Sequence, residues 1–173
     1  MKIFKLTVFL ALIAGLSGAI LSTVYTVTEP IIEEANFKVE QENLVKIYNN
    51  GEEFIENDIG IEDYDSIENI YEVILNDEIQ GYVYKISVYG YGGDIEYLIA
   101  LDCDGTYKGY EVIDCSSETS GFGSQVGEEE FQSTIVGKSI GDDIDTISGA
   151  TISSTAVVGG INDAYEHYST YFK

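Results

Sequence analysis

The start of the chain has a different pattern of hydrophobic and polar positions from the rest. Leu6 to Thr28 is an uncharged run rich in Leu, Ile, Val, Phe and Ala. As a helix, this run would reach about 35 Å, which is enough to cross a bilayer. The pattern therefore predicts one transmembrane helix over residues 6–28, preceded by a short cytoplasmic segment of residues 1–5.

A cleaved signal peptide is the alternative for this segment. Ser17, Gly18 and Ala19 are small residues at a plausible cleavage position. However, the apolar run continues well past Ala19 and exceeds the usual length of a signal-peptide core. The length favours an anchor that stays on the protein.

Residues 29–69 indicate a helical and acidic connecting region. Glu29-Pro30 predicts a break or a new helix start. Apolar positions at helical spacing then predict an amphipathic helix that ends near Asn49-Asn50-Gly51. These positions are Ile32, Ala35, Val39, Leu44 and Ile47. Residues 52–68 are acid-rich and show no clear periodicity.

From residue 70 onward, the pattern changes to short β-rich runs. Four strands are predicted at residues 71–75, 82–89, 95–101 and 107–113, separated by turn residues, and an antiparallel meander is the simplest topology. A short helix over 128–136 and a longer helix after Thr151 follow. The fold class is therefore α+β, an antiparallel sheet flanked by helices, and residues 70–173 form the folded domain.

Charge predicts the orientation of the chain. Lys2 and Lys5 precede the apolar run, whereas all 31 acidic residues follow it with six Lys and no Arg, a net charge of −25. The positive-inside rule places the amino terminus in the cytoplasm and the domain outside it. So acidic a surface repels phosphate backbones, which excludes nucleic acid as a partner.

The cysteines and the single histidine indicate no metal or hydrolase site. A two-residue hairpin at Asp104-Gly105 would pair Cys103 with Thr106 and carry Cys115 about 30 Å away, so we expect no disulfide between them. No CxxC pattern is present. One histidine, His167, cannot build a multi-histidine metal site.

Asp145-Thr146-Ile147-Ser148-Gly149-Ala150-Thr151 is the most informative segment. Its small residues would let a bulky group approach the backbone. Hydroxyls at Ser153, Ser154 and Thr155 then stand at the start of a helix, whose free N–H groups favour an anion. An ordinary helix N-cap with spare hydroxyls is the alternative.

This segment resembles the Asp-x-x-[Ser/Thr]-Gly-Ala-Thr flavinylation motif of the FMN-binding domain family, and all five specified positions agree. The family includes the G subunit of Rnf-type electron transport complexes and the C subunit of sodium-translocating NADH:quinone oxidoreductases. The resemblance implies that a flavin transferase attaches FMN to Thr151 through a phosphoester. The other cofactor-binding residues expected in this segment are Asp145, Ser148, Gly149, Ala150, Ser153 and Ser154.

A second segment, Glu118 to Ser124, resembles the family's Glu-Thr-Pro-Gly-Leu-Gly loop, with Ser120 in place of Pro and Phe122 in place of Leu. The resemblance implies that this loop borders the flavin ring; a plain Gly-Ser loop is the alternative. Its expected cofactor-binding residues are Glu118, Thr119, Gly121, Phe122 and Gly123. Stacking of a cofactor on tyrosines is also conceivable, but tyrosine is a favoured strand residue. The tyrosines concerned are Tyr82, Tyr84, Tyr89 and Tyr91.

The function that the resemblance implies is electron transfer by a membrane-anchored, extracytoplasmic flavoprotein with covalent FMN. Its partners would be other membrane subunits of a ferredoxin:NAD oxidoreductase coupled to Na⁺ or H⁺ movement, and it would not be a catalyst alone. Two alternatives stay open. One is a stand-alone anchored FMN carrier of an extracellular electron-transfer chain, and the other is an acidic cell-surface binding module without a cofactor.

The lysine asymmetry yields a test of orientation. Protease added to intact spheroplasts should remove residues 29–173, because the positive-inside rule places them outside the cytoplasm. The measurement is an immunoblot against the C-terminal region, with a cytoplasmic protein as the protected control. Protection of the domain would reverse the predicted orientation.

Overall fold

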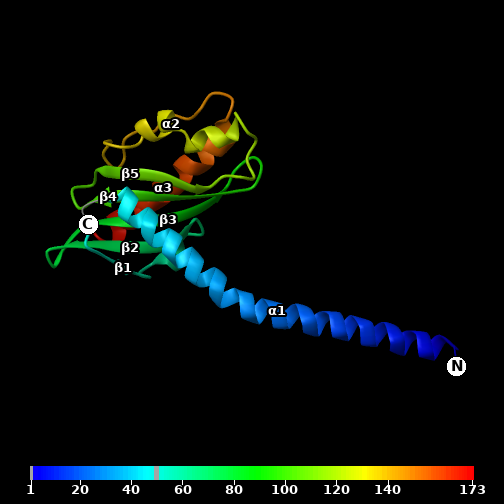
Figure 1. The fold of residues 1–173 in the computed structure, drawn as a ribbon. Helices are drawn as coiled ribbons and strands as arrows, with labels where there is room; N and C mark the ends of the chain where they lie inside the picture. The colour runs from blue at the N-terminus through cyan, green and yellow to red at the C-terminus, as the bar shows by residue number, and fades with distance from the viewer. Residues whose placement is uncertain (1, 49–50) are drawn as a thin grey trace. The chain divides into compact units, whose positions relative to one another are not determined.

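The computed structural model describes residues 2–48 and 51–173 and divides the chain into two units, Met1–Glu42 and Asn43–Lys173 (Figure 1). The second unit contains all the strands and every residue of the expected cofactor site.

The described part of the first unit is helical throughout. It belongs to α1, Lys2–Ile47, which continues without interruption through Glu29-Pro30. The predicted break there is wrong. Proline fixes φ near the helical value, so it can remain in a helix at the cost of one backbone hydrogen bond.

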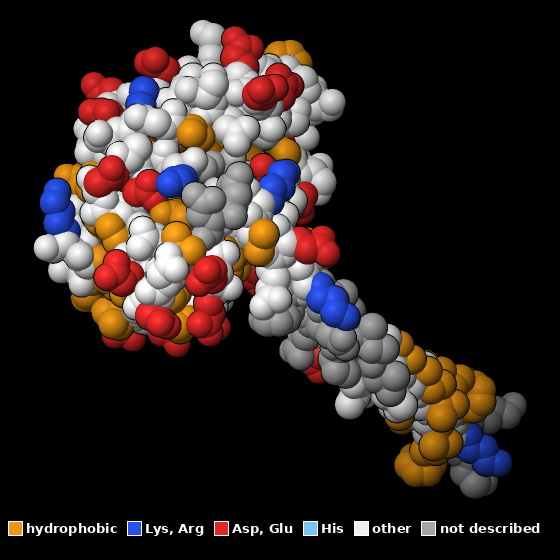
Figure 2. All heavy atoms as spheres, turned by 60° about the vertical axis from the view of Figure 1, so that its left-hand side comes forward, with side chains coloured by type: hydrophobic (Ala, Val, Ile, Leu, Met, Phe, Trp, Pro, Cys, Tyr) orange, Lys and Arg blue, Asp and Glu red, His pale blue; other side chains and the backbone are white. Residues whose placement is uncertain are grey.

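The span Phe4–Thr26 of α1 is long and apolar enough to cross a membrane, and none of it is buried within the protein. Figure 2 shows hydrophobic side chains gathered along this segment, whereas acidic side chains are spread over the visible face of the second unit. Hydroxyl groups in the span bond to their own helix: Thr23 Oγ1 donates to the carbonyl of Ala19 at 2.8 Å and Thr26 Oγ1 to that of Ser22 at 2.9 Å. Their polarity is therefore satisfied without water.

The second unit is built on one five-stranded antiparallel sheet in which each strand pairs with its sequence neighbour. The predicted α+β class and the meander of four strands are confirmed. The strands are β1 (Glu53–Glu56), β2 (Ile67–Leu75), β3 (Glu78–Tyr89), β4 (Asp94–Asp102) and β5 (Tyr107–Asp114). Strand β1 is an addition, and it lies in the acid-rich stretch with no readable periodicity. Only Phe54 of β1 is partly buried, so this edge strand has almost no hydrophobic pattern.

Two hairpins show how turn residues set the register. Asn76 and Asp77 join β2 to β3 with φ of 55° and 61°, as a two-residue hairpin loop requires. Between β4 and β5, Leu101 pairs with Tyr107. The predicted pairing of Cys103 with Thr106 is therefore wrong.

The loop between β4 and β5 has three residues instead of two. The N–H of Asp102 donates to the carbonyl of Thr106 at 2.9 Å, which leaves residues 103–105 in the turn. Gly105, with φ of 84°, takes the left-handed position of such a loop. Cys103 and Cys115 are both free and lie beyond opposite ends of β5.

Hydrophobic side chains cover both faces of the central strands. Tyr84 on β3 and Tyr97 on β4 are buried in the larger cluster, whereas Val83 and Leu98 are buried in the smaller one on the other face. The smaller cluster also includes Leu44, whose prediction as an apolar helix position is thereby confirmed. Tyr82 and Tyr84 belong to the core, which excludes them as stacking residues for a cofactor.

Two short 3₁₀ helices and two α-helices complete the unit: η1 (Ile61–Asp63), η2 (Gly123–Gly127), α2 (Glu129–Ser133) and α3 (Thr151–Tyr171). Helix α2 is shorter than the predicted helix 128–136. Helix α3, orange to red in Figure 1, buries Val157, Ile161 and Ala164 against the larger cluster. Gly160 faces Tyr97 and Ile86, where a Cβ would lie only 2.7 Å from Ile86 Cγ2. This glycine lets α3 approach the sheet closely.

His167 connects α3 to the segment before η1. Its side chain is fully buried, and Nε2 lies 2.6 Å from the carbonyl oxygen of Ile59. Since a carbonyl only accepts, Nε2 carries the proton and the neutral Nδ1 accepts from the Tyr84 hydroxyl at 3.2 Å. Burial lowers the pKa of His167, while the bond to Ile59 and the charge of Asp63 partly oppose this shift.

We expect this histidine to make stability depend on pH. Because its pKa is lower in the folded state, the unfolded chain binds more protons as the pH falls below the ordinary value of 6.5, and stability is lost. Urea denaturation at a series of pH values between about 7.5 and about 5.5 measures this loss. His167→Gln should flatten the curve in this window; an equally steep curve in that variant would assign the effect to other groups.

Candidate functional site

Three segments of the second unit meet at a pocket of about 390 Å³. They are the β3–β4 loop, the loop that leads into η2, and the first turn of α3. The lining residues are Tyr91, Thr119, Phe122, Gly123, Gly149, Ala150, Thr151, Ile152 and Ser153.

The first turn of α3 presents free donors to this pocket. Thr151 is the first helical residue and is exposed. The first intrahelical bond runs from the N–H of Ser154 to the carbonyl of Ala150 at 2.9 Å, so the N–H groups of residues 151–153 have no acceptor within the helix. No acidic residue stands in this turn and no side chain caps it. The helix end therefore carries partial positive charge beside the Thr151 hydroxyl.

The N-cap alternative considered for this helix start does not apply to Ser154. Its side chain stabilises the turn before the helix instead. Its buried Oγ accepts from the N–H of Ile147 at 3.0 Å and donates to the carbonyl of Ala150 at 2.9 Å. Between these residues, Gly149 adopts a φ of 89°, which favours glycine. This arrangement leaves Thr151 exposed at the surface.

Ser153 also has a role other than capping. Its buried hydroxyl donates to Oε2 of Glu118 at 2.8 Å, while Oε1 of Glu118 accepts from the N–H of Gly92 at 3.0 Å. Glu118 is only 7% exposed. One carboxylate thus joins its own loop, the β3–β4 loop and α3.

Glycines make room for this carboxylate. A Cβ on Gly90 would overlap Oε1 of Glu118, and one on Gly123 would overlap Oε2 and lie 2.9 Å from Ser153 Oγ. By contrast, Gly121 has open space and a φ of 76°. The charge of Glu118 reaches nearby groups: burial raises the pKa of the Cys115 thiol, and Asp114 and Glu118 raise it further.

The rim of the pocket is apolar in an otherwise acidic domain. Tyr91, Phe122 and Ile152 line it and are exposed by 68%, 58% and 58%. Exposed apolar side chains grouped around a hollow mark a ligand site or an interface. Ile152 was not among the predicted site residues, and Tyr91 had been considered only as one of four tyrosines on which a cofactor could stack.

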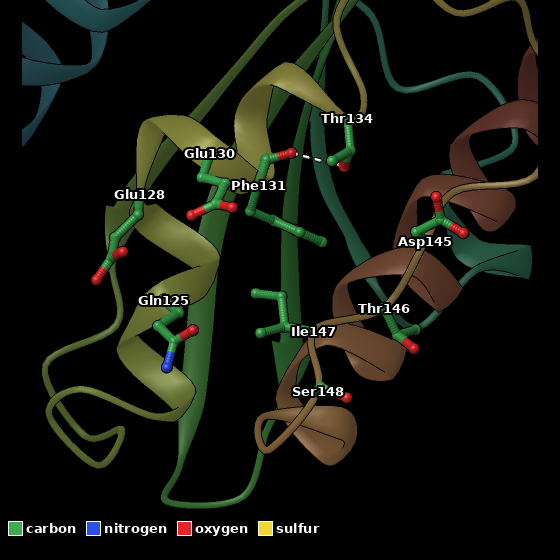
Figure 3. A pocket seen from close by; sticks show the side chains of 9 residues that line it. All are labelled: Gln125, Glu128, Glu130, Phe131, Thr134, Asp145, Thr146, Ile147 and Ser148. Atoms are coloured by element: carbon green, nitrogen blue, oxygen red, sulfur yellow. Dashed lines mark hydrogen bonds between the residues drawn. The ribbon is translucent and has the colours of Figure 1, made fainter.

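A second, more polar pocket of about 310 Å³ lies next to the motif (Figure 3). Phe131 and Ile147 point into it, and the carboxylates of Glu130 and Asp145 lie on opposite sides. Its lining residues are Gln125, Glu128, Glu130, Phe131, Thr134, Asp145, Thr146, Ile147 and Ser148. Asp145 and Ser148, which we expected at the cofactor, line this neighbouring pocket instead of the first one.

The other predicted residues fall into two groups. Those that line the first pocket are Thr119, Phe122, Gly123, Gly149, Ala150, Thr151 and Ser153. Those that do not line it are Glu118 and Ser154, which are buried, and Gly121, which lies in the same loop as Glu118. The two segments that resemble family motifs are therefore brought together, although not every residue in them faces the pocket.

Comparison with known proteins finds a family domain in this part of the chain. Residues 90–166 match the FMN-binding domain, and this range includes every residue of the first pocket. These residues belong to the FMN-binding domain family. The range begins at the β3–β4 loop, so α1 and the first three strands lie outside the matched part.

Two relatives that match nearly the whole chain are named as subunits of an oxidoreductase complex. The chain is 26% identical to the G subunit of the proton-translocating ferredoxin:NAD(+) oxidoreductase complex of Clostridium ljungdahlii, over 98% of this chain and 94% of that protein. It is 28% identical to the G subunit of the Na(+)-translocating ferredoxin:NAD(+) oxidoreductase complex of Acetobacterium woodii, over 99% of this chain and 94% of that protein. The resemblance to these relatives therefore extends through α1 and β1.

The crystal structure of Shewanella oneidensis NqrC has a similar fold. The TM-score is 0.51 at 23% identity, over 60% of this chain and 58% of that chain. The chain thus spans little more than half of that structure. At this identity the likeness concerns the fold alone.

The contacts of Ser154 predict a stability effect at the site. Ser154→Ala should lower the free energy of unfolding by roughly 1–3 kcal/mol, because Ile147 N–H loses its acceptor in a half-buried position. Thr155→Ala, at an exposed position of the same turn, should change it by less than about 0.5 kcal/mol. Urea denaturation of both variants measures the difference; equal effects would contradict the assigned role of Ser154.

Proposed function

We propose that the chain is the FMN-bearing, membrane-anchored subunit of an Rnf-type ferredoxin:NAD oxidoreductase complex. It passes electrons between partner subunits and does not catalyse a reaction alone. The observation that carries the proposal is the pocket in which the exposed Thr151, at an uncapped helix start, meets an apolar rim. The family match over this pocket and the two relatives from such complexes support it.

The start of α3 fits the phosphate end of FMN. Three successive N–H groups without helical acceptors stand beside the Thr151 hydroxyl, and such helix ends bind phosphate. This feature compensates for the lack of Arg in the chain. A phosphoester on Thr151 Oγ1 would place the phosphate within reach of these donors, which is why we assign the covalent bond to Thr151.

The apolar rim fits the flavin ring. Tyr91 and Phe122 offer aromatic surfaces, and Ile152 adds an aliphatic one next to Thr151. The pocket volume lies within the usual range for small-molecule and cofactor sites. When bound, FMN supplies the electron-transfer chemistry, and the chain supplies attachment, orientation and electrostatics.

The apolar part of α1 supplies the membrane attachment in this proposal. Phe4–Thr26 would span the bilayer once, with Lys2 and Lys5 on the cytoplasmic side and the second unit outside. An exported domain keeps a covalently bound flavin even when the medium lacks it. The proposed partners are the other membrane subunits and a flavin transferase, with Na⁺ or H⁺ as the transported ion, as in the two relatives.

The alternative within the same class is a stand-alone anchored FMN carrier, which would use the same pocket. Purification in mild detergent distinguishes an Rnf-type subunit from a stand-alone carrier. Other membrane subunits should copurify with an Rnf-type subunit, whereas a stand-alone carrier would be isolated as a single yellow chain. A colourless chain, made together with its transferase, would support the cofactor-free binding module instead.

Thr151→Val tests the covalent attachment. Valine keeps the shape and β-branching of threonine but removes the oxygen, so the chain should fold without gaining the mass of one FMN less one water. Intact mass and in-gel fluorescence after denaturation are the measurements. Thr155→Val and Ser148→Ala should stay fluorescent. Fluorescence that persists in Thr151→Val would move the bond to another hydroxyl.

A further inference from the structure

Glu118 is a buried acid with an unusual set of partners. Both of its oxygens accept hydrogen bonds, from the N–H of Gly92 and the hydroxyl of Ser153, which is the pattern of a carboxylate. The ion pairs among the described residues join Lys46, Lys85 and Lys108 to other acids. No lysine therefore neutralises Glu118 in the described part of the chain.

The carboxylate lies directly behind the pocket wall. Gly123 and Ser153 both line the pocket, and both contact Glu118: Ser153 through its hydroxyl, and Gly123 because the carboxylate fills the space of its absent Cβ. A ligand in the pocket is thus separated from the charge by one layer of small residues. In this partly desolvated position, electrostatic interactions are stronger than in water.

A neutral side chain could hold these segments at lower cost. A glutamine amide would offer an oxygen to Gly92 and a hydrogen-bond partner to Ser153, without the penalty of burying a charge. The partial positive charge at the start of α3, to which Ser153 belongs, offsets part of the penalty of burying the carboxylate. A buried negative charge next to a pocket opposes the addition of negative charge to a ligand in that pocket.

We propose that Glu118 is a positioning residue that clamps the β3–β4 loop and the 118–123 loop to α3, and that its negative charge lowers the reduction potential of the flavin. The inference rests on the proposed function, since it needs FMN in the pocket. Reduction adds electrons to the flavin, and a nearby negative charge opposes that gain. Glu118 is not itself a redox group.

Two substitutions with opposite expected shifts test the proposal. Glu118→Gln removes the charge and keeps hydrogen-bonding groups, so the potential should shift to a more positive value. Ser153→Ala keeps the charge but removes a donor that stabilises it, so the potential should shift to a more negative value. Spectroelectrochemical titration of the full-length, flavinylated protein in detergent measures both shifts, with Thr155→Ala as the unshifted control.

Hydrogen exchange measures the clamp separately. In a Thr151→Val background, which bears no covalent flavin, Ser153→Ala should speed amide exchange in residues 90–93 and 118–123, whereas Glu118→Gln should change it by less than about twofold. Shifts of potential in the same direction in both variants, or no shift in either, would overturn charge tuning. Unchanged exchange in Ser153→Ala would overturn the clamp.

The outcomes distinguish this inference from the proposed function. If the wild-type chain acquires no FMN when it is produced together with its transferase, the proposed function and charge tuning are both overturned. Hydrogen exchange still decides the clamp in that case. If the chain carries FMN but neither variant shifts the reduction potential, charge tuning alone is overturned. If Glu118→Gln does not fold, Ser153→Ala decides: a potential equal to that of wild type counts against the proposal.

Discussion

The close packing of α3 on the sheet is the constraint on which the rest of the second unit depends. Gly160 lets the helix approach β4, and the hydroxyl of Tyr97 donates to the carbonyl of Val157 at 2.7 Å within the core. This contact fixes the direction of α3 and thereby the place of its first turn. An uncapped helix start can bind an anion only where other segments build a pocket around it.

A single buried carboxylate joins those segments. Glu118 lies 35 residues before Ser153 and 26 after Gly92, and it bonds to both. Loops far apart in sequence would otherwise lose conformational entropy without compensation when they meet. The glycines at 90 and 123 have a packing reason here, because a side chain at either position would displace the carboxylate. The hydrogen bonds that join these segments and the carboxylate next to the pocket thus come from the same side chain.

The strongest local patterns predicted their elements well. Short β-rich runs identified β2 to β5, because the central strands bury hydrophobic side chains on both faces. Asn76-Asp77 suits its hairpin because two positive φ values are needed there. Weak or competing patterns failed. β1 buries almost nothing, Pro30 fits a continuing helix, and the Asp104-Gly105 signal suits both a two-residue and a three-residue loop.

By itself, the sequence determined the apolar span, the fold class, and the two segments that resemble the FMN-binding motifs. These features depend on residues close together along the chain, where periodicity and spacing are directly readable. Only the tertiary structure decided that Ser153 and Ser154 hold other segments instead of capping, that Tyr91 and Ile152 border the pocket, and that Asp145 faces a neighbouring one. Such roles depend on which distant backbone a side chain meets, and hydrogen bonds between remote segments leave no local pattern in the sequence.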